Sequence, residues 1–371
     1  MANGFAPYLL KSIAEIAKEN NPEYTLDPAG YFNLLLSQGS ADVVSNGPTQ
    51  NGHLREVRVK SLQRAIVAQT DTTASCDNVN VPAYNEATVP LDIYRQIGIY
   101  IDDITIARYE SEASASILVG QPPTKFMREF VKNIMTHTDA IVQGLDQDLL
   151  TKQLAAVGVN TNTGNNAAKA INIPKSTLTN PLDDSITEIL YDYQTNGFRG
   201  KPQVVGSGLI QKWFIQQAYK FVDQSGIDSR IQASMMNFFP DLNFGTIFGA
   251  DQALLVAPNT VQLVEWMFNQ GSFAGNKGVS QFGVMTLPMQ VGFDVLPVNF
   301  DFQLKYIDCP TSLIDAYSGA TITAARGYAL IISKNVGLYT LPTNAYQAGD
   351  RLAGVRGTLR YALTNECDVC A

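Results

Sequence analysis

The most regular hydrophobic pattern in the chain runs from Pro122 to Val157 and predicts one long helix. Apolar residues recur three and four positions apart, so one broad face is apolar and the rest is polar. The two prolines at its start and Gly158 after its end suit the ends of a helix. At about 1.5 Å per residue the helix would be roughly 54 Å long. The residues expected to face inward are Phe126, Phe130, Ile134, Ile141, Leu145 and Leu149, with Met127, Val131, Met135, Val142 and Leu154 beside them.

A helix of this length needs either a coiled-coil partner or an extended sheet to cover its apolar face. The apolar heptad does not continue, and the sequence just before the helix is strand-like. We therefore expect residues 122–157 to lie as a spine on a long sheet.

Residues 1–54 contain two short apolar segments separated by polar stretches. Residues 5–19 predict a short amphipathic helix, and residues 30–39 (GYFNLLLSQG) give a second apolar segment. The sequence that follows is rich in Asn, Gly and Ser, which is typical of an extended loop. We interpret residues 1–54 as an N-terminal arm instead of a domain.

From Leu54 the pattern changes to alternating, β-branched sequence, which predicts long antiparallel strands. Residues 55–90 are expected to form an extended β-hairpin loop. Because an isolated two-stranded hairpin is marginal in water, this ribbon should lie on something else, such as another subunit.

The remaining chain divides into three parts, which completes an α+β fold. Residues 91–180 form a peripheral domain that carries the spine. Residues 181–300 form an axial α/β domain, in which helices are expected over 209–224, with Leu209 facing inward, and over 260–271. Residues 301–371 supply return strands shared between the two domains. Long strands at both ends of the chain predict a sheet built from remote segments.

Composition limits the classes of function. The 371 residues are 45% hydrophobic and 16% charged, which suits a large folded core in two or three domains. The formal charge of −8 is spread along the chain without a basic cluster, which argues against binding nucleic acid by phosphate neutralisation. No apolar run approaches the roughly 18 residues of a membrane span. We expect a product that is cytoplasmic where it is made.

The cysteines are the only candidate metal ligands with a suitable spacing. Cys367 and Cys370 form a Cys-x-x-Cys pair, which is half of a zinc site, and Cys76 and Cys309 could complete it if the fold or a neighbour brought them close. An inter-subunit disulfide and free thiols remain open as alternatives. Four scattered cysteines argue against a secreted disulfide framework, and we assign no metal.

Other site motifs are incomplete. His53 and His137 have no ligand partner at helical or turn spacing. Gly206 and Gly208 lie between a strand and a helix as in a dinucleotide turn, but Gln211 stands where the third glycine belongs, so a plain strand-to-helix turn is favoured.

The remaining candidates also lack a complete pattern. The segment 271–278 lacks the spacing and the Gly-Lys-Ser/Thr ending of a phosphate loop. The neighbouring carboxylates Asp102 and Asp103, like Asp183 and Asp184, should point apart on a strand or cap a helix instead of forming an acid/base couple. We therefore predict no catalytic residue, no cofactor and no enzyme activity.

The order of these parts resembles the major capsid proteins of tailed bacteriophages, the Hong Kong 97-like fold. The resemblance covers nearly the whole chain and is one of architecture instead of strict motifs. The stretches that carry it are LREVRVKSLQRAIVAQTDTT and ATVPLDIYRQIGIYIDDITIARYE for the extended loop and sheet, residues 122–157 for the spine, KPQVVGSGLIQKWFIQQAY and QALLVAPN for the axial domain, and DRLAGVRGTLRYAL near the end.

The resemblance implies a self-assembling protein that forms hexamers and pentamers in an icosahedral shell around double-stranded DNA. The arm and the ribbon, which lack support in their own subunit, would lie across neighbouring subunits that bury their apolar sides. The protein's partners would be a portal, possible decoration proteins and, because the arm starts at Met1, a separate scaffolding protein. The packaged DNA would be contacted only weakly, the protein would be found in the virion after assembly in the host cytoplasm, and no membrane would be bound. Two alternatives stay open: an encapsulin-like compartment shell, and an α/β enzyme that binds a nucleotide at Gly206.

Overall fold

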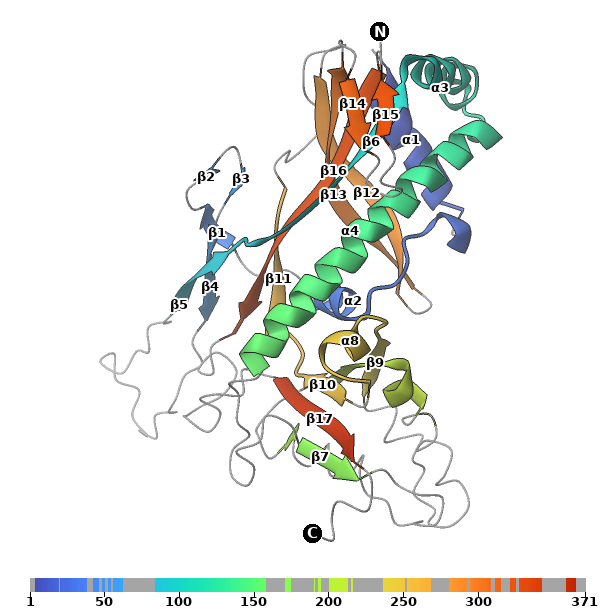
Figure 1. The fold of residues 1–371 in the computed structure, drawn as a ribbon. Coiled ribbons are helices and arrows are strands. Elements are labelled where there is room, and N and C mark those ends of the chain that lie inside the picture. Colours follow the sequence, from blue (N-terminus) through green and yellow to red (C-terminus); the bar gives the residue numbers. More distant parts are fainter. Residues whose placement is uncertain are drawn as a thin grey trace, which may run out of the picture.

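The computed structural model describes most of the chain. The described residues are 4–19, 21–38, 43–46, 49–50, 53–54, 56–62, 84–157, 171–174, 200–212, 236–250, 252–267, 280–291, 294–307, 311–314, 321–324, 327–341 and 358–364, with Leu190, Tyr193, Gln194 and Ile215. Figure 1 shows a long helix that crosses one sheet and ends beside a second one. Helix and strand occur in similar amounts, in agreement with the predicted α+β class.

The larger sheet is built from segments far apart in the sequence, as predicted. Its order is β11 (Val261–Trp266), β16 (Gly327–Thr340), β13 (Asp294–Ile307) and β12 (Ser280–Val291), and β6 (Ile93–Asp102) also pairs with β16. All of these pairs are antiparallel. At fourteen residues, β16 is long enough to pair with β13 over its first half and with β11 over its second.

Helix α4 (Lys125–Val157) is the predicted spine, and it lies diagonally across this sheet (Figure 1). Its 33 residues correspond to about 50 Å. It begins three residues later than predicted, because Pro122 and Pro123 lie in the preceding turn. The predicted inward face is correct. Phe126, Phe130 and Leu154 are partly buried, and the fully buried members are Met127, Val131, Ile134, Met135, Ile141, Val142, Leu145 and Leu149.

The two helices of the predicted arm are part of the main core. Helix α1 (Phe5–Ala17) packs on α4 and on α3 (Asp103–Ala115), where the rings of Phe5 and Phe130 meet edge to face with centroids 5.8 Å apart. Helix α2 (Gly30–Ser37) has Phe32 completely buried. The expectation that the arm's apolar segments would lack partners in their own chain is therefore wrong.

The connection between α1 and α2 also contacts the body. It contains the short 3-10 helix η1 (Pro22–Tyr24), and Leu26 then pairs with the edge strand β12. The Leu26 amide donates to the Pro288 carbonyl at 2.8 Å, and the Gln290 amide donates back to the Leu26 carbonyl at 3.3 Å. Residues 4–19 and 21–38 thus run across the spine and along the sheet edge instead of extending away.

The second sheet lies at the C-terminal end of α4 (Figure 1). Its order is β7 (Ile171–Pro174), β17 (Thr358–Thr364), β10 (Gln252–Val256), β8 (Gln203–Gly206) and β9 (Asn237–Pro240), and it mixes parallel and antiparallel pairs. The short helix α8 (Phe244–Ile247) follows β9. The C-terminal strand β17 lies between β7 and β10 in this sheet, whereas β13 and β16 belong to the larger one. The return strands therefore contribute to both sheets.

Two predictions for the axial region are wrong. Residues 261–266 form strand β11 and not a helix, because Val261, Leu263 and Val264 pair with and pack around β16 in the larger sheet. The predicted axial range 181–300 therefore includes strands that the structure places in the other sheet. In the helical residues 208–212 after β8, Leu209 is exposed and Ile210 is buried, so the predicted inward position of Leu209 is wrong.

The predicted hairpin is a three-stranded ribbon. Strand β4 (Glu56–Leu62) lies between β5 (Tyr84–Pro90) and β1 (Val43–Asn46), and both pairs are antiparallel. Two small hairpins complete the described strands: β2 (Thr49–Gln50) with β3 (His53–Leu54), and β14 (Thr311–Ile314) with β15 (Thr321–Ala324). No helix among the described residues is both long enough and apolar enough to cross a membrane.

Candidate functional site

The spine helix holds the N-terminal segment through regularly spaced charges. Arg128 forms two hydrogen bonds of 2.6 Å with the carboxylate of Glu19, and this contact lowers the pKa of Glu19. One turn further on, Lys132 pairs with Glu23. From the first pair to the second, the position increases by four residues on both the helix and the N-terminal segment. The N-terminal segment therefore follows the surface of the helix.

Asp139 continues this row in a different way, because its partner is a backbone amide and not a cation. The amide of Asp27 donates to its Oδ1 at 2.8 Å. Burial and, to a smaller extent, the nearby carboxylate of Asp27 raise the pKa of Asp139 to about 6, although the hydrogen bond from the Asp27 amide opposes this. The N-terminal segment is thus held by two cationic contacts and by one hydrogen bond to an acid that burial keeps easier to protonate.

On the sheet side, two ion pairs fix the spine to β6. Arg95 donates two hydrogen bonds of 2.7 Å to Asp148, a bidentate geometry that sets orientation as well as distance. Lys152 donates to Asp92 at 2.6 Å. These contacts place the C-terminal half of the spine on the strand that leads from the ribbon into the sheet.

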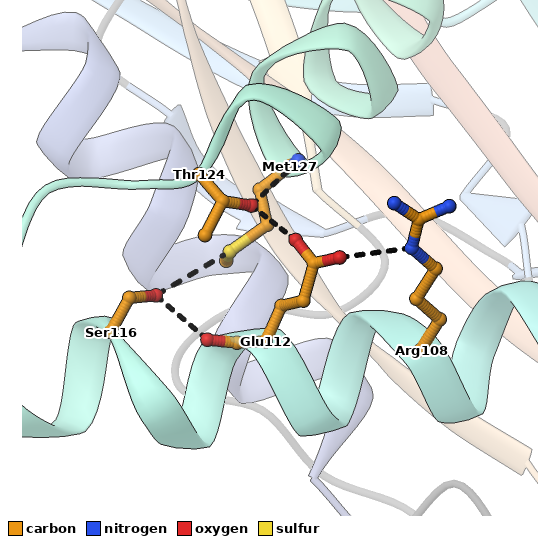
Figure 2. Close-up of polar contacts among 5 residues, drawn as sticks. All are labelled: Arg108, Glu112, Ser116, Thr124 and Met127. Atoms are coloured by element: carbon orange, nitrogen blue, oxygen red, sulfur yellow. Dashed lines mark hydrogen bonds and ion pairs between the residues drawn. The ribbon is translucent and has the colours of Figure 1, made fainter.

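The start of the spine is set by the corner shown in Figure 2, where α3, the 3-10 turn η2 (Ile117–Val119) and α4 meet. Glu112 of α3 accepts hydrogen bonds from the Thr124 hydroxyl and, at 2.9 Å, from Arg108. The hydrogen bond from Thr124, followed by that from Arg108, lowers the pKa of Glu112 although burial opposes this. The Thr124 hydroxyl also accepts from the Met127 amide at 3.4 Å, as a helix cap does.

The base of the ribbon is attached to the body through a small separate core. Val57, Val59 and Val89 of the ribbon pack with Leu91, Val264 and Tyr339. The Tyr339 hydroxyl donates to Ser61 at 3.2 Å. A Cβ at Gly337 would lie 2.5 Å from the Pro90 carbonyl oxygen, so β16 approaches the end of β5 closely. The ribbon is expected to lie on something else, such as another subunit, but one of its faces lies on its own chain.

The other face of the ribbon is exposed. Burial alternates along β5: Val89 is buried and Ala87 is partly buried on one face, whereas Tyr84, on the opposite face, is 50% exposed. Lys60 lies 4.4 Å from the centre of the Tyr84 ring, an exposed cation–π contact. Figure 1 shows the ribbon leaving the body beside the C-terminal half of the spine. The ribbon is therefore held by the body on one face and exposed on the other.

A pair of buried carboxyl groups joins the spine to the second sheet. Asp146 of α4 and Asp241, which follows β9, are 0% and 3% exposed and hydrogen bond to each other. Asp146 accepts the Phe32 amide at 3.0 Å, and Asp241 accepts the Tyr31 amide at 2.8 Å. The N-terminus of α2 thus lies against both acids, where its partial positive charge is favourable.

Lys334 of β16 is a second buried charge, with no exposed surface. It pairs with Glu265 of β11 at 3.0 Å and donates to the Asn299 carbonyl at 2.8 Å. Its ammonium group lies 5.4 Å from the ring of Phe300 and 5.9 Å from that of Phe32. The residue therefore joins three strands of the larger sheet to α2.

Most of the predicted site residues are not brought together. Cys76, Cys309, Cys367 and Cys370 lie outside the described residues, so their metal or redox state remains a prediction. Segment 271–278 and the pair Asp183 and Asp184 lie outside them as well. Within the part of the chain that the structure describes, no group of three or more His, Cys, Asp or Glu side chains could hold a metal ion.

The described candidates take structural positions. Gly206 and Gly208 form a strand-to-helix turn, and a Cβ at Gly206 would lie 3.1 Å from Ile210. His53 lies in β3, and the ring of His137 contacts the Asn133 carbonyl one helical turn away. Asp102 caps α3 by accepting the Thr105 amide at 2.6 Å, which is one of the two positions expected for this carboxylate pair. The assignment of residues 103–110 to the sheet is wrong, because they lie in α3.

Sequence reasoning missed the buried groups Asp146, Asp241 and Lys334. Asp146 offered one signal, because it lies between Leu145 and Leu149 on the apolar face of the spine, where a charge is unexpected. The partner Asp241 lies 95 positions away and has no local signal. Such a pair becomes visible only once the spine and the loop after β9 are placed together.

The comparisons with known proteins found likenesses among solved structures. No family model and no curated protein matches the chain. A capsid structure of the cyanophage P-SCSP1u is 10% identical with a TM-score of 0.41, covering 89% of this chain and 87% of the other. A structure from Mycobacterium phage Adephagia is 12% identical with a TM-score of 0.40, covering 90% of each chain. The capsid of a native GTA particle is 10% identical with a TM-score of 0.38, covering 90% of this chain and 97% of the other. Two of these three structures are described as capsids.

Proposed function

We propose that this chain is the major capsid protein of a tailed bacteriophage, with a Hong Kong 97-like fold, and that it assembles into the icosahedral shell enclosing double-stranded DNA. The observation that carries the proposal is the ribbon β1-β4-β5. One of its faces packs on the body and the other is exposed, and the ribbon stands away from the sheet in Figure 1. A subunit built to cover a neighbour needs a projecting element of this kind.

The spine supports the same proposal. It is longer than a compact domain of this size requires, and ion pairs fix it to both the N-terminal segment and β6. A rigid rod of this kind keeps the ribbon and the second sheet at a constant separation. Constant separation is what a repeating lattice demands of each copy.

The finer features follow as parts of the proposal. The copies would form hexamers and pentamers, with residues 1–54 as the arm, 55–90 as the extended loop, 91–180 as the peripheral domain and the sheet around β8 and β10 as the axial domain. A scaffolding protein, a portal and possible decoration proteins would be the partners. The net charge of −8 suits a wall in the virion that does not hold DNA tightly. Assembly would take place in the host cytoplasm.

Neither alternative gains support from a specific contact. The encapsulin-like reading requires the same fold and is favoured by no feature of the described residues. The nucleotide-binding reading requires a free turn at Gly206, but the carbonyl of Gly206 accepts the Asp241 amide at 3.0 Å and its Cα faces Ile210. We therefore propose a structural and not an enzymatic role.

Electron microscopy combined with mass measurement of the purified chain tests the proposal. We expect closed polyhedral shells or capsomers of five and six copies. A uniform monomer or dimer at every protein and salt concentration tested would contradict the proposal. A bound nucleotide lost in Gly206→Ala would instead favour the enzyme alternative.

A further inference from the structure

We propose that Asp146 and Asp241 form a proton-dependent latch, which holds α2 and the loop between β9 and α8 on the spine helix and is released as the pH rises. The inference concerns the single subunit and does not rest on the proposed function. It is carried by the geometry of the pair and by the groups that surround it.

The two carboxyl groups collect hydrogen bonds from two separate elements. Asp241 accepts the Tyr31 amide of α2 through Oδ2, and through Oδ1 it accepts the amides of Asn243 at 2.8 Å and Phe244 at 3.0 Å. Asp146 accepts the Phe32 amide through Oδ1. The junction of three elements therefore depends on these two side chains.

The loop and α2 are also in direct contact. A Cβ at Gly30 would lie 2.4 Å from the Pro240 carbonyl oxygen and 2.6 Å from the Cβ of Asp241. Only glycine allows this approach, so the N-terminus of α2 presses against the loop that carries Asp241. A change in the repulsion between the acids acts directly on this contact.

The amide side chains around the pair complete its polar shell. The Asn243 amide nitrogen donates to Asp146 Oδ2 at 3.1 Å and to Gln143 at 3.0 Å, and its Oδ1 accepts from Gln147 at 3.1 Å. These neutral groups orient Asn243 and bring no positive charge to the acids. A second negative charge at the pair is thus not compensated by them.

The remaining charged and titratable groups nearby do not neutralise the pair either. Tyr31 of α2 is fully buried, and its pKa is raised by burial and further by Asp146. Lys334 of β16 faces the ring of Phe32 and is paired with Glu265. Among the described residues, no cationic side chain forms an ion pair with either acid.

Two ionised carboxylates in contact and away from water repel each other, so one proton is required to hold them together. Burial first, and then the charge of Asp241, together raise the pKa of Asp146 to about 8. The closed latch therefore retains a proton that an exposed aspartate, with a pKa near 4, has lost. The stabilisation is complete below about pH 4, declines as the pH rises and is lost once the pH passes about 8.

Hydrogen exchange measured by mass spectrometry on the intact chain tests the latch. Peptides covering residues 28–37 and 240–248 report on the amides that the two acids accept, and a peptide covering α3 serves as the internal reference. After correction for the intrinsic exchange rate, we expect protection in both latch peptides to fall by up to about tenfold per pH unit between pH 5 and 8, and then to level off. The α3 peptide should lack this dependence.

Asp146→Asn is the matching variant, because an asparagine keeps one acceptor for the Phe32 amide and donates to Asp241 as a protonated acid does. We expect it to flatten the pH dependence, whereas Asp148→Asn on the exposed side of the same helix should leave it unchanged. Constant protection of the latch peptides in the unmodified chain, or an unaltered slope in Asp146→Asn, would overturn the proposal. The unmodified chain decides the matter even if the variant does not fold, and shells may form or fail to form in either case.

Discussion

Helix α2 and the ribbon β1-β4-β5 carry the same sequence signal and have opposite outcomes. Both are short segments with apolar positions that have no local partner, and both predict cover by a neighbouring subunit. In the structure α2 is covered by its own chain, with Phe32 and Leu34 completely buried. The ribbon is covered on one face only, and Tyr84 on its other face is half exposed.

The difference shows what a hydrophobic pattern can and cannot predict. A periodic pattern says that apolar surface must be covered, but it does not say by which segment. α2 finds its cover because the spine offers Asp146 and an apolar face at the right place. Among the described residues, the ribbon packs on the ends of β11 and β16, and these cover only one of its faces. The predictions below test this contrast, beginning with the largest effect.

Truncating a buried side chain of α2 should destabilise the subunit far more than truncating one at the ribbon's outer end. Phe32→Ala removes a ring with no exposed surface, so we expect a loss of about 3–5 kcal/mol in the free energy of unfolding. Tyr84→Ala should cost less than about 0.5 kcal/mol in the isolated subunit. Chemical denaturation of both variants measures the difference, and equal losses would remove the contrast between the two regions.

The buried charge between α2 and the larger sheet should also matter. Lys334→Ala leaves Glu265 without its partner and opens a cavity, so we expect a loss of about 3 kcal/mol. Lys334→Met keeps most of the volume and should cost less, although Glu265 still loses its ion pair. Thermal unfolding of the two variants measures this order, and a larger loss in Lys334→Met than in Lys334→Ala would contradict it.

The attachment of the ribbon can be disturbed at one glycine. Gly337→Ala places a Cβ 2.5 Å from the Pro90 carbonyl oxygen, so the base of the ribbon must shift, at a cost of about 1–3 kcal/mol. Gly98→Ala on β6 is the matched control, because nothing lies within 4 Å of its new Cβ. Gly337→Ala should reduce both assembly and stability, and Gly98→Ala should reduce neither. Indistinguishable variants would show that the close approach is not needed.

The smallest effect concerns Asp139, which holds the segment before α2. Its pKa is raised to about 6 by burial and by Asp27, so the folded chain binds a proton that the unfolded chain loses near pH 4. Stability from this group is therefore present at low pH and lost as the pH rises through about 6. Asp139→Asn should remove this dependence and stabilise the subunit by about 1 kcal/mol at pH 7 after allowance for solvent screening. Urea denaturation at pH 5 and pH 7 checks the sign, which would be reversed if Asp139 were stabilised as an anion.

The sequence predicted the elements that repeat a period over many residues. The spine, its inward face and the remote strands of the larger sheet could all be read from their apolar spacing. β11 could not, because a run such as VQLVEW carries apolar residues at positions that suit a helix as well as a buried strand. Pairing with β16, which lies about seventy residues away, decides the matter.

The polar contacts of the candidate site were the least predictable part. Helix caps such as Asp102 have a local signature and could be predicted. The pairs Asp146 with Asp241 and Lys334 with Glu265 depend on distant segments that meet only in the folded chain. The free-energy cost of burying these charged groups is offset by polar partners that lie far away in the sequence.

The most direct test of the central claim is to shorten the ribbon without disturbing its base. Leu62 and Tyr84 are directly opposite each other in β4 and β5, so residues 63–83 can be replaced by a two-residue Asn-Gly turn. Electron microscopy of this variant beside the unmodified chain measures assembly, and thermal unfolding of dissociated subunits measures folding. We predict shells from the unmodified chain, none from the shortened one, and subunits of equal stability. Normal shells from the shortened chain would contradict the role that we assign to the ribbon.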